Sequence, residues 1–477
     1  MLANRLRGSA LISLALLNVC TLGAGVAVAG LLPARLALWK IPRVAAAPVA
    51  SPGQVLSPAQ GSAAVPTSSG LSSVLTPILV SSALGSHVGA VVTDPASGAV
   101  LWSSDGDSPA KPASTTKLAT AVAALDVLGP AGRFTTKVVA GATAGSIVLV
   151  GGGDPTLAAG TPPASDFPQP ATLTSLAAAT ARALKAQGRS QVELSYDTSL
   201  FTGPQMAPGW STSYVTSGNV TPITSLEVDQ GRLTTSGTPE DADDPGNFRA
   251  RSFDPAGDAA EAFASFLEAD GISVPGTVDE AAAAAGAASI AAVTSPPLSD
   301  IVGWMLRESN NVIAEDLARQ VALHTGAPAS FSGAAEAVTH VLAGLGVTGV
   351  DLVDGSGLST DDRITPAALT RLVVLASGAA HPRLRSVITG MPVAGFSGTL
   401  APDQSVFGHF AAPALGLVQA KTGNLDTVAA MAGLAYDQAG QVLAFAFMAD
   451  QVAPDSLPQA AADIDAMATA LAGCGCR

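Results

Sequence analysis

Residues 112–117 read PASTTK, and residues 118–128 continue as LATAVAALDVL. The apolar residues of the second stretch recur at helical spacing, which predicts a helix with Ser114 at its N-terminus. Ser114 and Lys117 share one helix face because they lie three residues apart. A desolvated lysine can take the serine proton, and N–H groups at a helix N-terminus can stabilise a reacting carbonyl. Taken alone, the pattern is more typical of a serine that caps a helix.

A second motif, Ser309-Asn310-Asn311, lies between two stretches with helical periodicity, residues 298–307 and 312–323. Ser309 could pass a proton to a leaving group, and Asn311 could hold a substrate amide while it hydrogen-bonds the lysine. The plain alternative is a turn between two helices with an N-cap residue. By itself this motif favours the plain alternative.

A third motif, Lys421-Thr422-Gly423, lies on a strand-like segment that follows residues 416–420, GLVQA. A fixed cation and a hydroxyl on an edge strand suit a substrate carboxylate, and glycine lets another backbone approach closely. As a lone tripeptide the motif carries almost no information.

In this order the three motifs are the signature of penicillin-recognising serine acyl enzymes. Other stretches support the assignment: residues 133–136 (RFTT), 151–157 (GGGDPTL), 208–210 (PGW), 305–306 (ML), 314–315 (AE) and 354–359 (DGSGLS). Over residues 74–455 the sequence resembles the D-Ala-D-Ala carboxypeptidase/endopeptidase family of low-molecular-mass class C penicillin-binding proteins.

The resemblance implies an α+β fold, a β-lactamase/transpeptidase-like catalytic domain in which helices flank a five-stranded antiparallel sheet. The interval between Ser114 and Ser309 is too long for the small helical domain of a class A β-lactamase, which implies a large inserted α/β domain. The expected organisation is a signal peptide or membrane anchor (1–43), a Pro/Ala/Ser-rich linker (44–73), the first part of the catalytic domain (74–134), the insertion (135–295), the second part of the catalytic domain (296–455), and a C-terminal helix and tail (456–477).

The resemblance also implies catalytic roles. Ser114 would be the acylated nucleophile, Lys117 its general base, and Ser309 a proton shuttle to the departing amine. The backbone N–H groups of Ser114 and Asn424 would form the oxyanion hole. Asn424 stands where threonine is common, and because it would act through its backbone, the difference bears on substrate preference more than on catalysis.

Substrate binding is implied for the remaining residues of the second and third motifs. Asn311 would position the peptide, and Lys421 and Thr422 would bind its terminal carboxylate next to Gly423. Asn310 differs from the aspartate that class A β-lactamases often have at this position.

Several local patterns predict secondary structure. Residues 88–102 predict a hairpin around the turn residues 94–98, and residues 427–435 and 442–449 predict paired strands. Helical periodicity recurs at 366–377. The Ala-rich stretch 281–292 predicts a helix or a linker.

Two glycine-rich stretches have plain and functional interpretations. Residues 354–358 (DGSGL) fit a loop that lines the site and, equally, a turn that uses the positive φ of glycine. For residues 151–155 (GGGDP) a turn is preferred, because a phosphate cradle would need a following lysine or helix start.

The N-terminal segment predicts export. Arg5 and Arg7 precede the charge-free apolar residues 8–34, the pattern of an export signal that is also long enough to span a bilayer. Residues 27–29 (AVA) offer a cleavage site, so cleavage and retention as a cytoplasmic-membrane anchor are both open, and a buried core helix is the plain alternative. The expected location is extracytoplasmic, in the periplasm or the cell-wall space.

Composition excludes other classes. The 477 residues include 23 Lys and Arg against 37 Asp and Glu, a net charge of −14, which argues against nucleic-acid binding. The three cysteines and five histidines lack metal-ligand spacing, and no cysteine lies in the body of the chain. No metal, cofactor or thiol chemistry is therefore expected.

The sequence thus predicts an exported serine D-Ala-D-Ala carboxypeptidase, or also an endopeptidase, that acts on peptidoglycan stem peptides and is acylated by β-lactam antibiotics. A β-lactamase is the nearest alternative, but no glutamate in a Glu-x-x-Leu-Asn context lies between the first two motifs to serve as a deacylating base. A non-catalytic penicillin-binding sensor is the third possibility.

Overall fold

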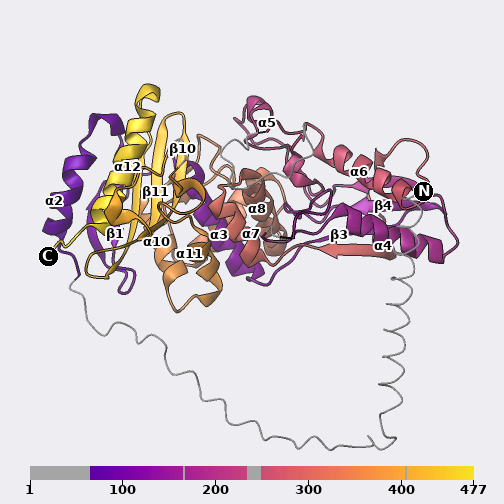
Figure 1. Ribbon diagram of the computed structural model, residues 1–477, viewed down its shortest axis with the longest axis horizontal. Helices are drawn as coiled ribbons and strands as arrows, with labels where there is room; N and C mark the ends of the chain where they lie inside the picture. The colour runs from indigo at the N-terminus through magenta and orange to yellow at the C-terminus, as the bar shows by residue number, and fades with distance from the viewer. Residues whose placement is uncertain (1–64, 165–166, 234–248, 403–405) are drawn as a thin grey trace, which may run out of the picture. The chain divides into compact units, whose positions relative to one another are not determined.

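The computed structural model describes residues 65–164, 167–233, 249–402 and 406–477 (Figure 1). One antiparallel sheet has the strand order β10-β11-β12-β1-β2. Its strands are β1 (Val88–Thr93), β2 (Val100–Ser104), β10 (Val418–Leu425), β11 (Val428–Tyr436) and β12 (Val442–Ala449). Strands from the two ends of the described chain pair within this sheet, since β1 lies between β2 and β12.

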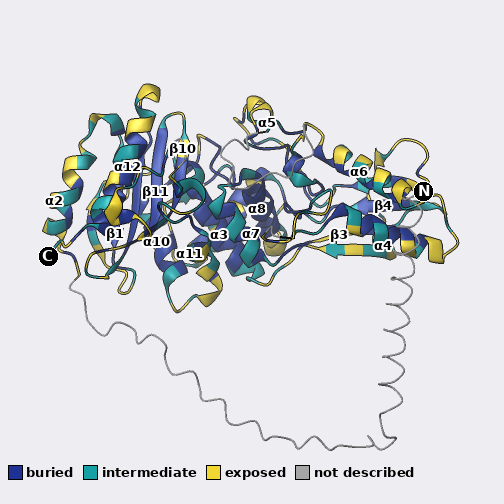
Figure 2. Cartoon of the chain, in the orientation of Figure 1, coloured by how far each residue is buried: buried dark blue, intermediate teal, exposed yellow. Residues whose placement is uncertain are grey.

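Helices cover both faces of this sheet. Side chains of a strand alternate between its faces, so Ala444, Ala446 and Met448 of β12 face one core, whereas Phe445 and Phe447 face the other. Both sets are buried, as the dark blue strands of Figure 2 show. The first core includes α3 (Thr116–Leu128), α7 (Leu298–Arg307), α8 (Asn311–Thr325), α9 (Phe331–Gly344), α10 (Pro366–Ser377) and α11 (Arg385–Gly390), and the second includes α2 (Ser68–Leu79) and α12 (Leu457–Ala472).

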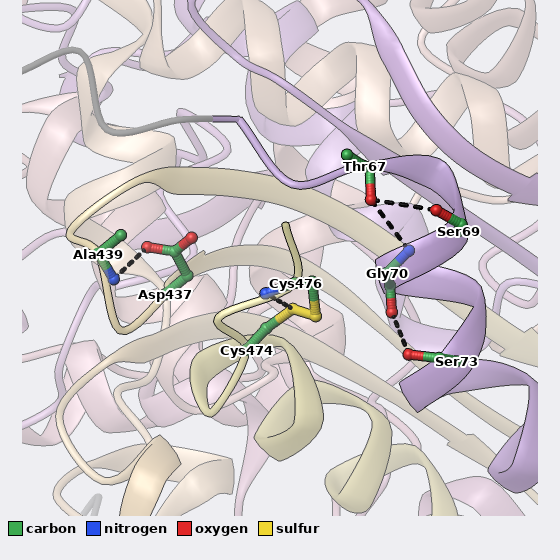
Figure 3. Close-up of a disulfide and its surroundings, with 8 residues drawn as sticks. All are labelled: Thr67, Ser69, Gly70, Ser73, Asp437, Ala439, Cys474 and Cys476. Carbon is green, nitrogen blue, oxygen red and sulfur yellow. Dashed lines mark hydrogen bonds between the residues drawn. A yellow bond between two sulfur atoms is a disulfide. The ribbon is translucent and has the colours of Figure 1, made fainter.

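The C-terminal tail joins the start of α2 to the sheet. The backbone N–H of Thr67, the N-cap of α2, donates to the carbonyl of Cys476 at 2.9 Å, and Gln438 donates to the carbonyl of Cys474. Cys474 and Cys476 form a disulfide that closes this short tail (Figure 3). Helix α2 therefore begins at Ser68, inside the predicted linker of residues 44–73, because the tail gives the first turn of this helix a partner. Residues 44–64 of that linker lie outside the described residues.

A second sheet forms between the first two motifs, with the order β6-β5-β4-β3-β7. Its strands are β3 (Thr135–Ala140), β4 (Ser146–Val150), β5 (Glu193–Asp197), β6 (Asp279–Glu280) and β7 (Ser289–Thr294). The pairs β4–β5 and β5–β6 are parallel, and β3 pairs antiparallel with β4 and β7. Helices α4 (Leu173–Ala186) and α6 (Pro255–Ala269) pack on it around a separate apolar core.

The prediction of a helix or linker for residues 281–292 is wrong at its C-terminal end. Ser289–Thr294 forms β7 along one edge of the second sheet. Alanine favours helices, but pairing with β3 gives this segment backbone hydrogen bonds that outweigh that weak preference.

Residues 198–233 leave the second sheet and pack on the helices of the first. Trp210 contacts Phe331 of α9 edge to face, with ring centroids 5.1 Å apart, and both share an apolar cluster with Val312 of α8. The segment contains the short helix α5 (Ser213–Thr216). The segment therefore brings part of the chain between the first and second motifs next to the second motif.

A small two-stranded sheet of β8 (Val350–Asp351) and β9 (Arg363–Ile364) completes the fold.

Most of the predicted elements are confirmed. The hairpin at 88–102, the helices at 117–128, 298–307, 312–323 and 366–377, and the paired strands at 427–435 and 442–449 all form. The five-stranded antiparallel sheet with helices on both sides confirms the predicted α+β class.

The predicted export segment, residues 8–34, lies outside the described residues. Among the helices that the structure describes, none combines the length and the apolar character needed to cross a bilayer.

Buried carboxyl groups lie where the 198–233 segment and the glycine-rich stretch 151–155 approach α8. Glu227 and Asp316 are buried, and neither of their carboxyl groups has a hydrogen-bond partner among the described residues. Burial raises the pKa of both well above the usual values, and their mutual repulsion raises that of Glu227 further. Burial also raises the pKa of the neighbouring Asp154 to about 6. The folded protein therefore holds protons here that the unfolded chain releases at neutral pH.

Because these carboxyl groups have raised pKa values, we expect the stability of the folded protein to decrease as pH rises. The stabilising effect of a raised carboxyl pKa is complete below the unfolded pKa and is lost as pH rises through the folded pKa. The free energy of unfolding should therefore fall as pH rises through about 6, the pKa of Asp154 in the folded protein, and continue to fall as Glu227 and Asp316 release their protons. Denaturant unfolding at several pH values measures this. Glu227→Gln should make the dependence less steep, while Asp154, Glu315 and Asp465, whose pKa values burial also raises, maintain part of it. Glu261→Gln, on the exposed face of α6, should leave the dependence unchanged. An equally steep dependence in Glu227→Gln would contradict the assignment.

Candidate active site

Ser114 lies in a 3-10 turn, Ala113–Thr115, that leads directly into α3. Ala113 before it has φ 45°, in the left-handed region that L-residues seldom adopt. Such strain persists only where surrounding contacts fix it, and it is common at functional sites. Here β10 closes on the turn, since a Cβ on Gly423 would lie 2.5 Å from the carbonyl oxygen of Pro112.

Lys117 is fully buried, and its Nζ lies within hydrogen-bonding distance of three oxygen atoms. These are Ser114 Oγ at 2.8 Å, Asn311 Oδ1 at 2.7 Å and the Ser356 carbonyl oxygen at 2.8 Å. A neutral amine has two N–H groups and one lone pair. The amine can therefore donate its two N–H groups to Asn311 Oδ1 and to the Ser356 carbonyl, because these oxygens can only accept. Its lone pair is then left to accept the proton of the Ser114 hydroxyl.

The surroundings of Lys117 favour its neutral form. Burial lowers its pKa from 10.5 to about 7, against the opposing attraction of Asp354, Glu315 and Asp362. A base with a pKa near neutrality is suited to take up a proton and release it again. The geometry and the charge balance therefore agree that Lys117 can activate Ser114.

Lys421 lies on the edge strand β10 and reaches the second motif. Its Nζ donates to Ser309 Oγ at 2.8 Å and to the carbonyl of Thr422 at 2.8 Å. Burial lowers the pKa of Lys421 well below its usual value, and the nearby Lys117 lowers it further. Ser309 has φ 56°, a second left-handed residue at the site. The hydroxyl of Thr422 contacts that of Thr399 at 2.9 Å.

The second motif opens α8. Asn310 caps this helix, because its Oδ1 accepts from the N–H of Ile313, and its Nδ2 donates to Gln230. Asn311 is the first helical residue, and its Nδ2 donates to the carbonyl of Asn219 at 2.8 Å. Both asparagines are thus held by residues of the 198–233 segment. Asn310 can therefore cap the helix while Ser309 and Asn311 take part in the site, so the plain and the functional interpretations of this motif are compatible.

The structure brings five of the eight predicted site residues together in two hydrogen-bonded sets: Ser114, Lys117 and Asn311 form one, and Ser309 and Lys421 form the other. The charge of Lys117 acts on Lys421 across the two sets. Thr422 and Gly423 follow on the same strand. Asn424 is exposed on β10, and its predicted contribution to an oxyanion hole stays a prediction. Among the described residues no cluster of His, Cys, Asp or Glu is arranged to hold a metal ion.

The loop at residues 354–359 serves both of its proposed purposes. Asp354 accepts the backbone N–H groups of Ser356, Gly357 and Ser359, which folds the loop into a turn, and it also accepts Trp210 Nε1–H at 2.9 Å. The turn presents the Ser356 carbonyl to Lys117. The sequence pattern indicates this loop but not the contact of Ser356 with the lysine, because a contact made by a backbone carbonyl does not depend on the residue type.

The glycine-rich stretch 151–155 forms the preferred turn. Asp154 accepts both the N–H and the hydroxyl of Thr156, and the carbonyl groups of Gly152 and Gly153 accept from Gln320 of α8. The stretch therefore links the second sheet to α8.

The fold and the ordered motifs are those of the penicillin-recognising serine acyl enzymes. The model of the D-Ala-D-Ala carboxypeptidase 3 (S13) family matches residues 71–250 and 235–471, so the chain belongs to this family. Carboxypeptidase Rv3627c of Mycobacterium tuberculosis is 37% identical over 88% of this chain and 87% of its own, and Carboxypeptidase DacB of Mycolicibacterium smegmatis is 37% identical over 90% and 88%. The crystal structure of penicillin binding protein 4 from Haemophilus influenzae, 22% identical, has a TM-score of 0.66 over 83% of this chain and 98% of its own, and shows the same fold.

Gly357 offers a test of the site geometry. It has φ 83°, and a Cβ there would lie 1.9 Å from the carbonyl oxygen of Ala113, next to Ser114. Gly357→Ala should displace the serine turn and slow acylation by benzylpenicillin about a hundredfold. Stopped-flow or gel-based labelling gives the rate.

Gly286→Ala is the matched control, because Gly286 has φ 75° with nothing within 4 Å of the added Cβ. It should cost about 1 kcal/mol of stability and leave the acylation rate unchanged. Wild-type acylation by Gly357→Ala would contradict the close approach of the two loops.

Proposed function

We propose that this protein is a serine D-Ala-D-Ala carboxypeptidase that trims peptidoglycan stem peptides through an acyl-enzyme on Ser114. The observation that carries the proposal is the buried Lys117 Nζ, 2.8 Å from Ser114 Oγ, with two further acceptors that orient its lone pair toward the serine. Membership of the S13 family and the carboxypeptidase relatives support it.

Acylation begins when Ser114 Oγ attacks the carbonyl carbon between the two D-Ala residues and Lys117 takes the hydroxyl proton. The peptide C–N bond breaks, and the leaving nitrogen receives a proton through the Ser309 hydroxyl. The proton that Lys117 has taken replaces the one that Ser309 gives up, so the amine is neutral again when the acyl-enzyme has formed. Water then attacks the ester carbonyl while Lys117 takes a proton from it, and Ser114 Oγ receives this proton as the ester C–O bond breaks, which frees Ser114 for another cycle.

Substrate binding depends on local charge. Because the chain carries a net charge of −14, its overall field repels a carboxylate. Lys421 and the hydroxyl of Thr422 bind the terminal carboxylate at the edge of β10, and Asn311 positions the peptide amide. The N–H groups of Ser114 and Asn424 stabilise the oxyanion, where losing one donor typically costs about 2.7 to 4 kcal/mol of barrier stabilisation.

The proposal extends to penicillin binding, endopeptidase activity and the location of the enzyme. A β-lactam amide mimics the scissile bond, so covalent penicillin binding at Ser114 follows. Cleavage of cross-links, an endopeptidase reaction, uses the same acyl-enzyme. Export by residues 8–34 would bring the enzyme to the periplasm or cell-wall space, anchored to the cytoplasmic membrane if that segment is retained.

D-Ala release from a diacyl-Lys-D-Ala-D-Ala peptide tests the proposal, together with mass spectrometry of the penicillin-treated protein. The wild type should release D-Ala and carry a slowly hydrolysed adduct on the Ser114 peptide. Ser114→Ala should lose both activities because it lacks the nucleophile.

Ser332→Ala is the control, because Ser332 is an exposed serine on α9 and should keep both activities. Wild-type protein without D-Ala release would contradict the proposal. Rapid hydrolysis of the adduct would indicate a β-lactamase instead.

A further inference from the structure

A buried glutamate lies one helical turn behind Asn311 on α8. Glu315 is four residues after Asn311, so both side chains lie on the same face of the helix. Asn311 contacts Lys117 directly, whereas Glu315 contacts the loop that also contacts Lys117: both of its carboxylate oxygens lie 3.1 Å from the N–H of Gly355. Glu315 is only 1% exposed.

The peptide groups next to this contact hold the catalytic helix α3. The carbonyl of Gly355 accepts from the hydroxyl of Thr120 at 2.6 Å, and the carbonyl of Ser356 accepts from Lys117 Nζ at 2.8 Å. Thr120 and Lys117 lie three residues apart on α3. Fixing the Gly355 N–H therefore fixes two consecutive carbonyl groups that α3 uses.

The loop at residues 354–359 also packs closely against α8 at Gly355. A Cβ on Gly355 would lie 2.7 Å from the Cβ of Ala318 and 3.0 Å from the carbonyl oxygen of Ala314, so backbone and helix are in close contact. Among the described residues, the Glu315 carboxylate is the only group that accepts a hydrogen bond from the Gly355 N–H.

We infer that Glu315 is a positioning residue for acylation: its carboxylate holds Gly355 and thereby places the Ser356 carbonyl against the Lys117 amine. The inference rests on the proposed function of Ser114 and Lys117. It assigns a role to a residue outside the three motifs, one that touches neither the substrate nor the nucleophile.

The charges around this contact predict how its loss would alter the pH profile. Asp354 and Arg319 face Glu315, with Arg319 Nη1 3.7 Å from its carboxylate. Asp354 and Asp362 also face Lys117, and Lys421 approaches it from β10.

Burial raises the pKa of Glu315 to about 7, Asp354 raises it further, and Arg319 opposes both. The negative charge of Glu315 in turn raises the pKa of Lys117. Its removal should therefore lower that pKa and move the acidic limb of the acylation profile to lower pH.

The experiment measures benzylpenicillin acylation and D-Ala release against pH for the wild type, Glu315→Gln and Glu315→Asp. Glu315→Gln loses the charge and one of the two oxygen acceptors of the Gly355 N–H, so we expect kcat to fall about tenfold or more with KM nearly unchanged, and the acidic midpoint to move to lower pH. Glu315→Asp keeps the charge on a shorter side chain, so it should lose rate while its midpoint stays near that of the wild type.

Glu336→Gln on the exposed face of α9 is the matched control and should behave as the wild type. A folded Glu315→Gln protein with wild-type kcat and midpoint would overturn the inference. If Glu315→Gln does not fold, Glu315→Asp decides: a lower rate with a wild-type midpoint supports the inference, and a wild-type rate overturns it. Failure of the wild type to acylate would instead contradict the proposed function.

Discussion

The buried amine of Lys117 is the constraint on which the rest of the site depends. Removing an ammonium group from water is costly unless it is paired or loses its charge. No carboxylate contacts Nζ directly among the described residues; its three partners are a serine hydroxyl, an asparagine oxygen and a backbone carbonyl. This set suits a neutral amine, and a neutral amine is what the chemistry of Ser114 requires. The acidic groups Asp354, Glu315 and Asp362 lie further out and limit how far the pKa falls.

This arrangement requires segments from most of the described chain. Helix α3 supplies Ser114 and Lys117, α8 supplies Asn311, the 354–359 loop supplies a carbonyl, and β10 supplies Lys421. The segment 198–233 adds the carbonyl of Asn219 behind Asn311 and the indole of Trp210 behind Asp354. The long interval between the first two motifs is therefore part of the site's support as well as the source of a second sheet.

The sequence allowed the motifs and the elements that carry them to be predicted, because those signals are local. The three-residue spacing of Ser114 and Lys117 and the alternating strands near the C-terminus are examples. The supporting contacts could not be predicted in this way. Glu315 accepts from the backbone of Gly355, Asp354 accepts from the indole of Trp210, and Asn219 offers its backbone carbonyl to Asn311. The partners in each contact are far apart in the sequence, and such contacts produce no periodicity. The start of α2 was missed for the same reason, since its partner is the C-terminal tail at Cys476. The strand β7 was missed because its alanines favour a helix until β3 provides a partner.

The most direct test of this account is the protonation of Lys117 itself. Nuclear magnetic resonance of protein labelled with ¹³C and ¹⁵N at lysine follows the Cε and Nζ signals against pH, and the signal that disappears in Lys117→Arg identifies the residue. The account predicts a midpoint near pH 7 in the folded protein, the value to which burial lowers this pKa. A midpoint close to 10.5, the ordinary value for lysine, would show that Lys117 is charged at neutral pH and would contradict its role as the base.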